Sequence, residues 1–226
     1  MDNKKNIITI IPARGGSKGI PNKNIIDCMG KPLIAHSIEY AQESDLVTSV
    51  YVSTDDDKIA AVAKGYGSEV ITRPASISGD TATTESAIEH ALDNIPKPDI
   101  VILLQATSPL RPIGSLDKAL DKMLLENYDS LLSLSPTHRF SWEVNGDEAI
   151  PKYDFKNRPR RQDIPESEQA YIENGSVYIF KYEHFIKHNN RLGGRMGHII
   201  FEEEFSFEID TPTDLIVIDS IAKTIK

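Results

Sequence analysis

Residues 10–24 read IIPARGGSKGIPNKN, and this stretch decides how the chain can fold. It begins inside an apolar run, residues 6–11, that is too short for a typical helix and is predicted to be a fully buried first strand. Pro12 ends that strand. The loop that follows mixes glycines with cations: Gly15, Gly16 and Gly19 lie among Arg14, Lys18 and Lys23.

The composition of this loop indicates a site for a polyphosphate. Glycine lets backbone N–H groups come close to a ligand, and successive amides in a turn form an anion-binding nest. Basic side chains beside such a nest add charge where phosphate oxygens would lie. The whole chain has a net charge of −9, so a local excess of cations needs a reason that solvated lysines on a surface turn do not supply. The loop matches neither G-x-G-x-x-G nor G-x-x-x-x-G-K-[ST], so neither the dinucleotide fingerprint nor the P-loop applies.

Composition bounds the class of protein. With 226 residues, of which 39% are hydrophobic and 26% charged, the chain is predicted to form one globular domain over residues 1–226. Its acidic balance argues against a nucleic-acid partner. No apolar run approaches the length of a membrane span and the N-terminus does not resemble a signal peptide, so no membrane association is expected. Cys28 is the only cysteine, which excludes an intramolecular disulfide and a cysteine metal site and favours a cytoplasmic location.

Apolar strands alternate with helix-spaced apolar faces through the first half of the chain. This alternation predicts a Rossmann-like, mostly parallel sheet sandwiched by helices. Residues 99–104 form the most apolar strand and should be central. Thr54 or Asp55 is expected to cap the helix after the second strand, and capping is favoured over a metal site for the aspartates at 55–57. The strands are predicted at residues 6–11, 50–53, 68–71 and 99–104, and the helices from Pro32, around 59–63 and at 81–94.

The alternation fails between residues 136 and 174. This segment contains the only tryptophan, Trp142, a hairpin signal at Asn145-Gly146 and the basic run 158–161. A long irregular insertion in a compact domain is usually functional or part of an interface, and disorder is the alternative. Ser115 is expected to cap the helix that precedes it. Further strands are predicted at residues 130–134, 174–180, 198–201 and 206–210, followed by a helix that Thr211 caps.

The predicted central strand delivers the sequence QATSPLR, residues 105–111, at its carboxyl end. Open parallel sheets bind ligands beyond the carboxyl ends of their strands, so this motif and the first loop should face one crevice. Together with residues 10–24, RQDIP at 161–165 and NGSVYI at 174–179, the motif resembles the acylneuraminate cytidylyltransferase family, the CMP-sialic acid synthetases. The family usually has Pro where this chain has Ala106. The resemblance covers almost the whole chain in five ordered blocks: 10–24, 71–84, 104–111, 161–178 and 206–215.

The resemblance implies a fold of the nucleotide-diphospho-sugar transferase type and a reaction. The anomeric hydroxyl of a nonulosonic (sialic-type) acid would attack the α-phosphate of CTP and release pyrophosphate. By the same analogy the triphosphate is held by Arg14, Ser17, Lys18 and Lys23, the cytidine by Asn24, Arg73 and Thr84, the sugar by Gln105 and Tyr178, and the acid's carboxylate by a bidentate contact from Arg161. The catalytic residues it implies are Arg14, Lys23 and Asp210. In the family the segment corresponding to residues 136–174 extends into a partner subunit and helps complete its active site, so a homodimer is expected.

Glu208 and Asp210 are predicted to form a magnesium site. They lie two apart on the predicted strand 206–210, so both should point to one face while Phe207 and Ile209 pack on the other. Acids on an exposed strand face are a common alternative. Magnesium is usually held by one or two carboxylates plus phosphate oxygens and water. Asp210 is therefore assigned as the direct ligand and Glu208 as a ligand or water-mediated partner, although the family often has Asp at the position of Glu208.

Two alternatives remain open at this stage. One is a related nucleotidyltransferase with another acceptor, such as the eight-carbon acid 3-deoxy-manno-octulosonate. The other, from a different class, is a non-catalytic nucleotide-binding regulator, which the presence of Arg14, Lys23 and Asp210 disfavours. The histidines show no ligand spacing and are interpreted as structural or surface residues. The sequence does not choose among neuraminic acid, its deaminated form, legionaminic acid and pseudaminic acid.

Overall fold

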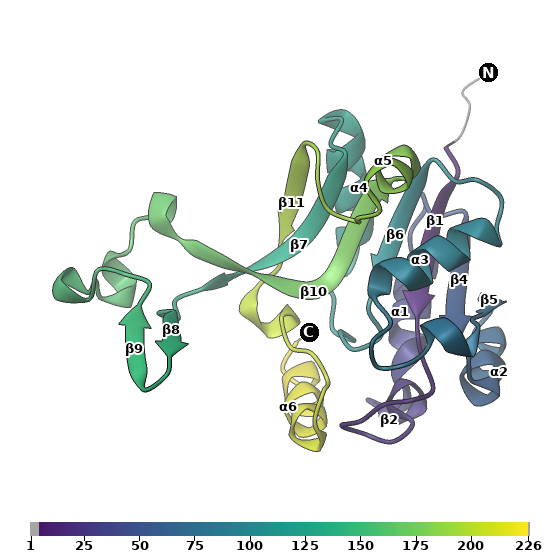
Figure 1. The fold of residues 1–226 in the computed structure, drawn as a ribbon, viewed down its shortest axis with the longest axis horizontal. Helices are drawn as coiled ribbons and strands as arrows, with labels where there is room; N and C mark the ends of the chain where they lie inside the picture. Colours follow the sequence, from purple (N-terminus) through teal and green to yellow (C-terminus); the bar gives the residue numbers. More distant parts are fainter. Residues whose placement is uncertain (1–4, 226) are drawn as a thin grey trace.

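A seven-stranded sheet forms the centre of the computed structural model, which describes residues 5–225 (Figure 1). Its strand order is β11-β7-β10-β6-β1-β4-β5, and only β10 runs antiparallel to its neighbours. β6 lies in the middle, as its apolar sequence predicted. The strands are β1 (Ile7–Pro12), β4 (Ser49–Thr54), β5 (Glu69–Thr72), β6 (Ile100–Leu104), β7 (Ser130–Thr137), β10 (Ala170–Lys181) and β11 (Met196–Ile200).

Helices cover both faces of the sheet, because alternate side chains of the buried strands point to opposite sides. On one face Ile11 and Ile102 pack with α1, α2 and α4. On the other, Ile10 and Leu103 pack with α3 and α5. The helices are α1 (Leu33–Gln42), α2 (Asp57–Gly65), α3 (Thr84–Asp93), α4 (Ser115–Leu125), α5 (Tyr182–His188) and α6 (Pro212–Ala222). The predicted fold class is confirmed.

Shorter elements complete the chain. A small antiparallel pair, β2 (Asp27–Cys28) and β3 (Lys31–Pro32), follows the first loop. Single 3₁₀ turns occur at Lys23–Ile25, Ala75–Ile77, Phe155–Asn157, Arg161–Asp163, Glu166–Glu168 and Glu203–Phe205. Within residues 5–225, none of the helices has both the length and the apolar character needed to cross a bilayer.

The segment 136–174, called the arm below, projects from the sheet at the left of Figure 1. Its two ends belong to β7 and β10, which continue to pair as far as Thr137 and Ala170. Beyond them a hairpin of β8 (Trp142–Asn145) and β9 (Glu148–Pro151) turns at Gly146, whose φ is +60°. The hairpin at Asn145-Gly146 was predicted. The extension of the two strands into the arm was not, because the irregular composition hides the pairing.

Two predicted helix caps are wrong. Asp56 caps α2, since its Oδ1 accepts from the backbone N–H groups of Lys58 and Ile59 at 2.8 and 2.9 Å, so neither Thr54 nor Asp55 does so. Asp55 instead accepts a hydrogen bond from the backbone of the first loop. Gly114, with φ +68°, occupies the cap position of α4, and Ser115 is the first helical residue. Capping therefore explains Asp56, although neither of the two residues predicted for that role is the cap.

The strand predicted at residues 206–210 does not form. β11 already pairs with β7 at that edge of the sheet, and residues 206–210 instead cross the carboxyl end of β6, where the Ile209 N–H donates to the Thr107 carbonyl at 2.8 Å. The alternation of Phe207 and Ile209 arises because both pack in a small cluster with α6. The helix start that follows is as predicted: Thr211 and Asp214 form a capping box and Pro212 is the first residue of α6.

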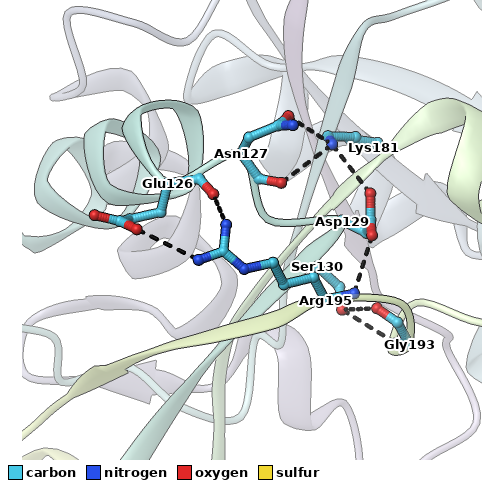
Figure 2. A network of polar contacts seen from close by, with 7 residues as sticks. All are labelled: Glu126, Asn127, Asp129, Ser130, Lys181, Gly193 and Arg195. Atoms are coloured by element: carbon cyan, nitrogen blue, oxygen red, sulfur yellow. Dashed lines mark hydrogen bonds and ion pairs between the residues drawn. The ribbon is translucent and has the colours of Figure 1, made fainter.

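A polar network beside β7, β10 and β11 fastens the end of the sheet opposite the carboxyl ends of its parallel strands (Figure 2). Lys181, at the end of β10, donates to Asp129 at 3.0 Å, and the Arg195 backbone N–H donates to the other oxygen of Asp129 at 2.9 Å. The Arg195 guanidinium reaches back to the carbonyl of Glu126 at the end of α4. These contacts tie together the starts of β7 and β11 and the end of β10. The network lies at the end of β7 away from the arm.

Candidate functional site

Two adjoining cavities open at the carboxyl ends of β1, β4 and β6. The first, called the loop cavity, has a volume of about 400 Å³ and is lined by Arg14, Ser17, Lys18, Lys23, Asn24, Thr107 and Asp210, among others. The second, called the side cavity, has a volume of about 210 Å³ and is lined by Arg14, Arg73, Asp80, Thr83 and Thr84, among others. Arg14 lines both. The structure therefore brings together the residues that the sequence assigned to triphosphate and cytidine.

Two glycines of the first loop, Gly15 and Gly19, are required by close packing. The Gly15 N–H donates to Asp55 Oδ1 at 3.0 Å, and a Cβ added to Gly15 would lie 2.8 Å from Asp56 Oδ2. A Cβ added to Gly19 would lie 2.2 Å from the carbonyl oxygen of Asp210. Gly16 has open space around it. The loop is thus held between the β4–α2 turn and the segment before α6.

Asp80 stands between two of the loop's cations. Its Oδ1 lies 3.1 Å from Arg14 Nη2 and its Oδ2 lies 2.7 Å from Lys18 Nζ. Arg14 Nη1 also donates to the carbonyl of Gly79 at 2.7 Å. The hydrogen bond from Lys18 holds the pKa of Asp80 below its usual value. Because the Asp80 carboxylate lies between Arg14 and Lys18, the space between these two cations can hold an anion. Sequence reasoning missed Asp80, whose only signal was its place in a block shared with the family.

Lys23 and Asn24 fix the other side of the loop. Lys23 Nζ donates to Asp210 Oδ1 and to the Ile209 carbonyl, both at 2.9 Å, and its side chain is only 14% exposed. Asn24 is buried and its Nδ2 donates to the Arg14 carbonyl at 2.9 Å. Asn24 therefore closes the loop on itself as well as lining the cavity.

Arg73 is a buried cation beside the side cavity. Its Nη2 donates to the Ser53 carbonyl at 3.1 Å, and its buried Nε has no hydrogen-bond partner among residues 5–225. Burial lowers the pKa of Arg73. Thr84 is the first residue of α3, whose cap Thr83 accepts from the Ser86 N–H at 3.1 Å. The side cavity thus combines a buried guanidinium with the N-terminal end of a helix.

A third cavity, called the bulge cavity, lies where β10 departs from regular pairing. Its volume is about 370 Å³ and its lining includes Arg139, Ile172, Glu173, Asn174, Phe207 and Glu208. Gly175 has φ +67°, and a Cβ there would lie 1.7 Å from Glu208 Oε1 and 2.9 Å from Gln105 Oε1. Only glycine leaves room for both side chains. Gln105 and Glu208 therefore converge on the backbone of the bulge.

The two carboxylates assigned to magnesium line different cavities. Asp210 faces the loop cavity, while Glu208 lines the bulge cavity. Burial and then the charge of Asp210 raise the pKa of Glu208. A pair of carboxylates suits magnesium only when phosphate oxygens and water complete the shell. The donor set at Asp210, next to the loop's cations, fits an ion that arrives with a triphosphate, and the fit of Glu208 is weaker.

Tyr178 and Arg161 lie apart from the other assigned residues. Tyr178 is 2% exposed and packs in the core, and its hydroxyl donates to Glu173. Arg161 is exposed on the arm and lines a separate cavity of about 670 Å³ with Phe140, Trp142 and Arg158. Neither side chain reaches the loop cavity or the side cavity.

Arg111 explains the position of Gln105. It is buried at the end of the QATSPLR motif, where it donates to Ser37 Oγ at 3.0 Å and to the carbonyls of Gln105 and Ser176 at 2.8 and 3.2 Å. Burial lowers the pKa of Arg111 to about 10, so it stays charged at neutral pH. Cys28 is buried as well, and burial raises the pKa of its thiol to about 11.

The sequence model of the family described as Cytidylyltransferase matches residues 8–225. The chain belongs to this family. It is 37% identical over 210 residues to N-acylneuraminate cytidylyltransferase B of Danio rerio, a match that covers 91% of this chain and 48% of that protein. It is 31% identical over 209 residues to N-acylneuraminate cytidylyltransferase of Escherichia coli O18:K1:H7, covering 92% of this chain and 50% of that protein. The chain thus spans about half the length of these relatives.

Other matches run end to end. Post-translational flagellin modification protein B of Campylobacter coli is 32% identical over 226 residues, which is 96% of this cytidylyltransferase chain and 95% of that protein. Among solved structures, a CMP:2-keto-3-deoxy-manno-octonic acid synthetase complexed with CTP has a TM-score of 0.73 at 18% identity, covering 97% of this chain and 99% of the other. A 4-diphosphocytidyl-2C-methyl-D-erythritol synthase of Anaerococcus prevotii has a TM-score of 0.68 at 14% identity, covering 98% and 100%. These two structural matches support the fold alone.

Gly19→Ala should weaken nucleotide binding while the sheet stays folded. The new methyl group meets the backbone carbonyl of Asp210, so the loop and the segment before α6 must separate. We expect the affinity for CTP, measured by calorimetric titration, to fall about tenfold or more, as when a charged hydrogen-bonding group is lost. Gly65→Ala, at the end of α2 with open space around it, is the control and should bind CTP as wild type does. Equal CTP affinity in both variants would show that this contact does not shape the site.

Proposed function

We propose that the chain is a cytidylyltransferase that activates a nonulosonic acid with CTP and releases pyrophosphate. The observation that carries this proposal is the loop cavity, where Arg14, Lys18 and Lys23 gather in a chain of net charge −9. Family membership and the N-acylneuraminate relatives favour CTP and a sialic-type acid as substrates.

The reaction would depend mainly on positioning and charge. Phosphoryl transfer needs little covalent help from protein, and catalysis comes from holding the reactants in line and neutralising the phosphate oxygens. We assign Arg14, Ser17, Lys18 and Lys23 to the triphosphate, and Asn24, Arg73 and Thr84 to the cytidine. A triphosphate that enters the loop cavity would compete with Asp80 for Arg14 and Lys18, which lie within 3.1 Å and 2.7 Å of that carboxylate. Lys23, held by the segment before α6, would stay in place.

Magnesium would be held by Asp210, with Glu208 as a less direct partner. When bound, the ion would offset negative charge on the triphosphate oxygens. Asp210 is 70% exposed at its side chain and already faces a cation, Lys23. It is therefore available to a second cation that arrives with the nucleotide.

The acceptor would lie on the side of Gln105, and its carboxylate would be bound by Arg161 of the partner subunit. Arg161 cannot serve the loop cavity of its own chain, because it is carried on the projecting arm. The arm exposes large apolar side chains, including Trp142 at 50%, Val144 at 75% and Phe155 at 57%, as a surface that a second copy would cover. We therefore propose a homodimer acting in the cytoplasm.

Two alternative functions would give different results in a single assay. A related enzyme would use an eight-carbon keto acid, a possibility that the fold match to a synthetase for 2-keto-3-deoxy-manno-octonic acid keeps open. A non-catalytic regulator would bind CTP without turnover.

The assay is pyrophosphate release from CTP and magnesium with each of several keto acids. We expect release with at least one nine-carbon acid, weaker or no release with the eight-carbon acid, and none without an acceptor. EDTA should abolish it, and Asp210→Asn should lower turnover by about 10²-fold or more because a group that organises transition-state charge is lost. Glu208→Gln should be milder. CTP binding without release for any acid would favour the regulator, and full activity in EDTA would contradict the metal assignment.

A further prediction concerns the arm. Light scattering should give the mass of a dimer at assay concentration. Arg161→Ala should raise KM for the keto acid about tenfold or more, because a bidentate contact to a carboxylate is lost, and leave KM for CTP nearly unchanged. Arg160, already paired with Asp163 at 2.6 Å, provides the control, and Arg160→Ala should have the smaller effect. A monomeric mass, or an effect on CTP alone, would contradict a shared acceptor site.

A further inference from the structure

Glu173 occupies a fixed position on the wall of the bulge cavity. It is the last residue of β10 before the pairing register with β7 shifts, between Glu173 and Tyr178. Asn174 ties the shifted turn to β7: its Oδ1 accepts from Ser133 Oγ at 2.5 Å and its Nδ2 donates to Ser135 Oγ at 3.0 Å. The backbone that carries Glu173 is therefore pinned to β7 by buried hydrogen bonds.

Tyr178 fixes the side chain of Glu173. The Tyr178 hydroxyl donates to Glu173 Oε1. The ring is 2% exposed, and the guanidinium of Arg191 lies 4.7 Å from its centre. Arg191 is in turn paired with Glu85 of α3. Burial, and then the contact with Glu173, raise the pKa of Tyr178, so the phenol keeps its proton and remains a donor.

The carboxylate of Glu173 is exposed to the cavity, whose lining includes one cation, Arg139. Its neighbours in the lining include a second carboxylate, Glu208, and no lysine or arginine among residues 5–225 forms an ion pair with Glu173. An ionised carboxylate is an acceptor with several lone pairs, of which Tyr178 uses one. The remaining lone pairs of the Glu173 carboxylate can therefore accept hydrogen bonds from a ligand.

We propose that Glu173 contacts the acceptor sugar, accepting hydrogen bonds from its hydroxyl or amide N–H groups, and that Tyr178 is a positioning residue that acts through Glu173. This rests on the proposed function, because it needs the bulge cavity to hold the acceptor. Sugar hydroxyls and acylamino groups supply donors for the lone pairs of Glu173 that Tyr178 leaves free. Glu173 repels the acid's own carboxylate, so the acceptor is oriented with its donor-rich part toward the bulge. Acids that lack a donor there are disfavoured, because they would cover the Glu173 carboxylate without giving it a partner.

The experiment compares Glu173→Gln, Tyr178→Phe and the double variant by steady-state kinetics, with Glu203→Gln as the control on the same cavity. Glu173→Gln should raise KM for the best keto acid about tenfold to a hundredfold, since a hydrogen bond to a charged group is lost, with KM for CTP and kcat little changed. Tyr178→Phe should raise the same KM by a smaller factor. The double variant should match Glu173→Gln alone, because residues that act through one another are not additive. Glu203→Gln should behave as wild type.

Several results would overturn the assignment. One is an unchanged KM for the acid in Glu173→Gln. Another is an equal rise of that KM in Glu203→Gln, which would mean that the net charge of the cavity, and not a contact with Glu173, sets the affinity for the acid. Fully additive effects in the double variant would give Tyr178 a contact of its own. Binding of N-acetylneuraminic acid to the protein in the presence of CDP, followed by ligand-observed NMR, separates this inference from the proposed reaction. Binding of N-acetylneuraminic acid that depends on Glu173, without pyrophosphate release, removes only the reaction. Release with an unchanged KM in Glu173→Gln removes only the assignment. If neither N-acetylneuraminic acid nor the best keto acid of the assay binds in the presence of CDP, the assignment is wrong.

Discussion

The contact between Lys23 and the segment at Ile209–Asp210 joins two ends of the chain, and the site depends on it. Lys23 Nζ donates both to Asp210 Oδ1 and to the Ile209 carbonyl at 2.9 Å, across 187 and 186 positions of sequence. The same segment lies against Gly19 and donates from Ile209 to the carbonyl of Thr107. The loop after β1, the motif after β6 and the segment before α6 are thereby locked together. The cavity exists only because a central parallel sheet brings all three to one edge.

A second constraint is electrostatic. Cations can be concentrated in one loop only if nearby acids offset their repulsion, and the acids used here are exposed. Asp80 pairs with Arg14 and Lys18, and both ion pairs are partly open to solvent, where such pairs contribute little to stability. Exposed carboxylates are therefore easily displaced by a ligand that carries more negative charge. The buried cations, Arg73 and Arg111, bond to backbone carbonyls instead and hold the frame.

The sequence predicted the sheet well because buried parallel strands are apolar on both faces. β1 and β6 were identified on that ground. The first loop was identified because it mixes glycines with cations. Prediction failed where one pattern has two physical causes. Residues 206–210 alternate like a strand, but Phe207 and Ile209 are apolar because they pack with α6. Among three adjacent aspartates, composition cannot say that Asp56 is the cap. Tyr178 and Glu173 show the same limit, since their contact exists only because β10 bulges between them.

The most direct test of the central claim, that the first loop binds a triphosphate, is a calorimetric titration of CTP and of inorganic triphosphate into wild type and Arg14→Ala. The account predicts that both ligands bind wild type and that the affinity for both falls about tenfold or more in Arg14→Ala, since each loses a charge-assisted hydrogen bond. Arg195→Ala, which removes an exposed arginine at the opposite end of the strands, should leave both affinities unchanged. Wild-type affinity for both ligands in Arg14→Ala would contradict the account.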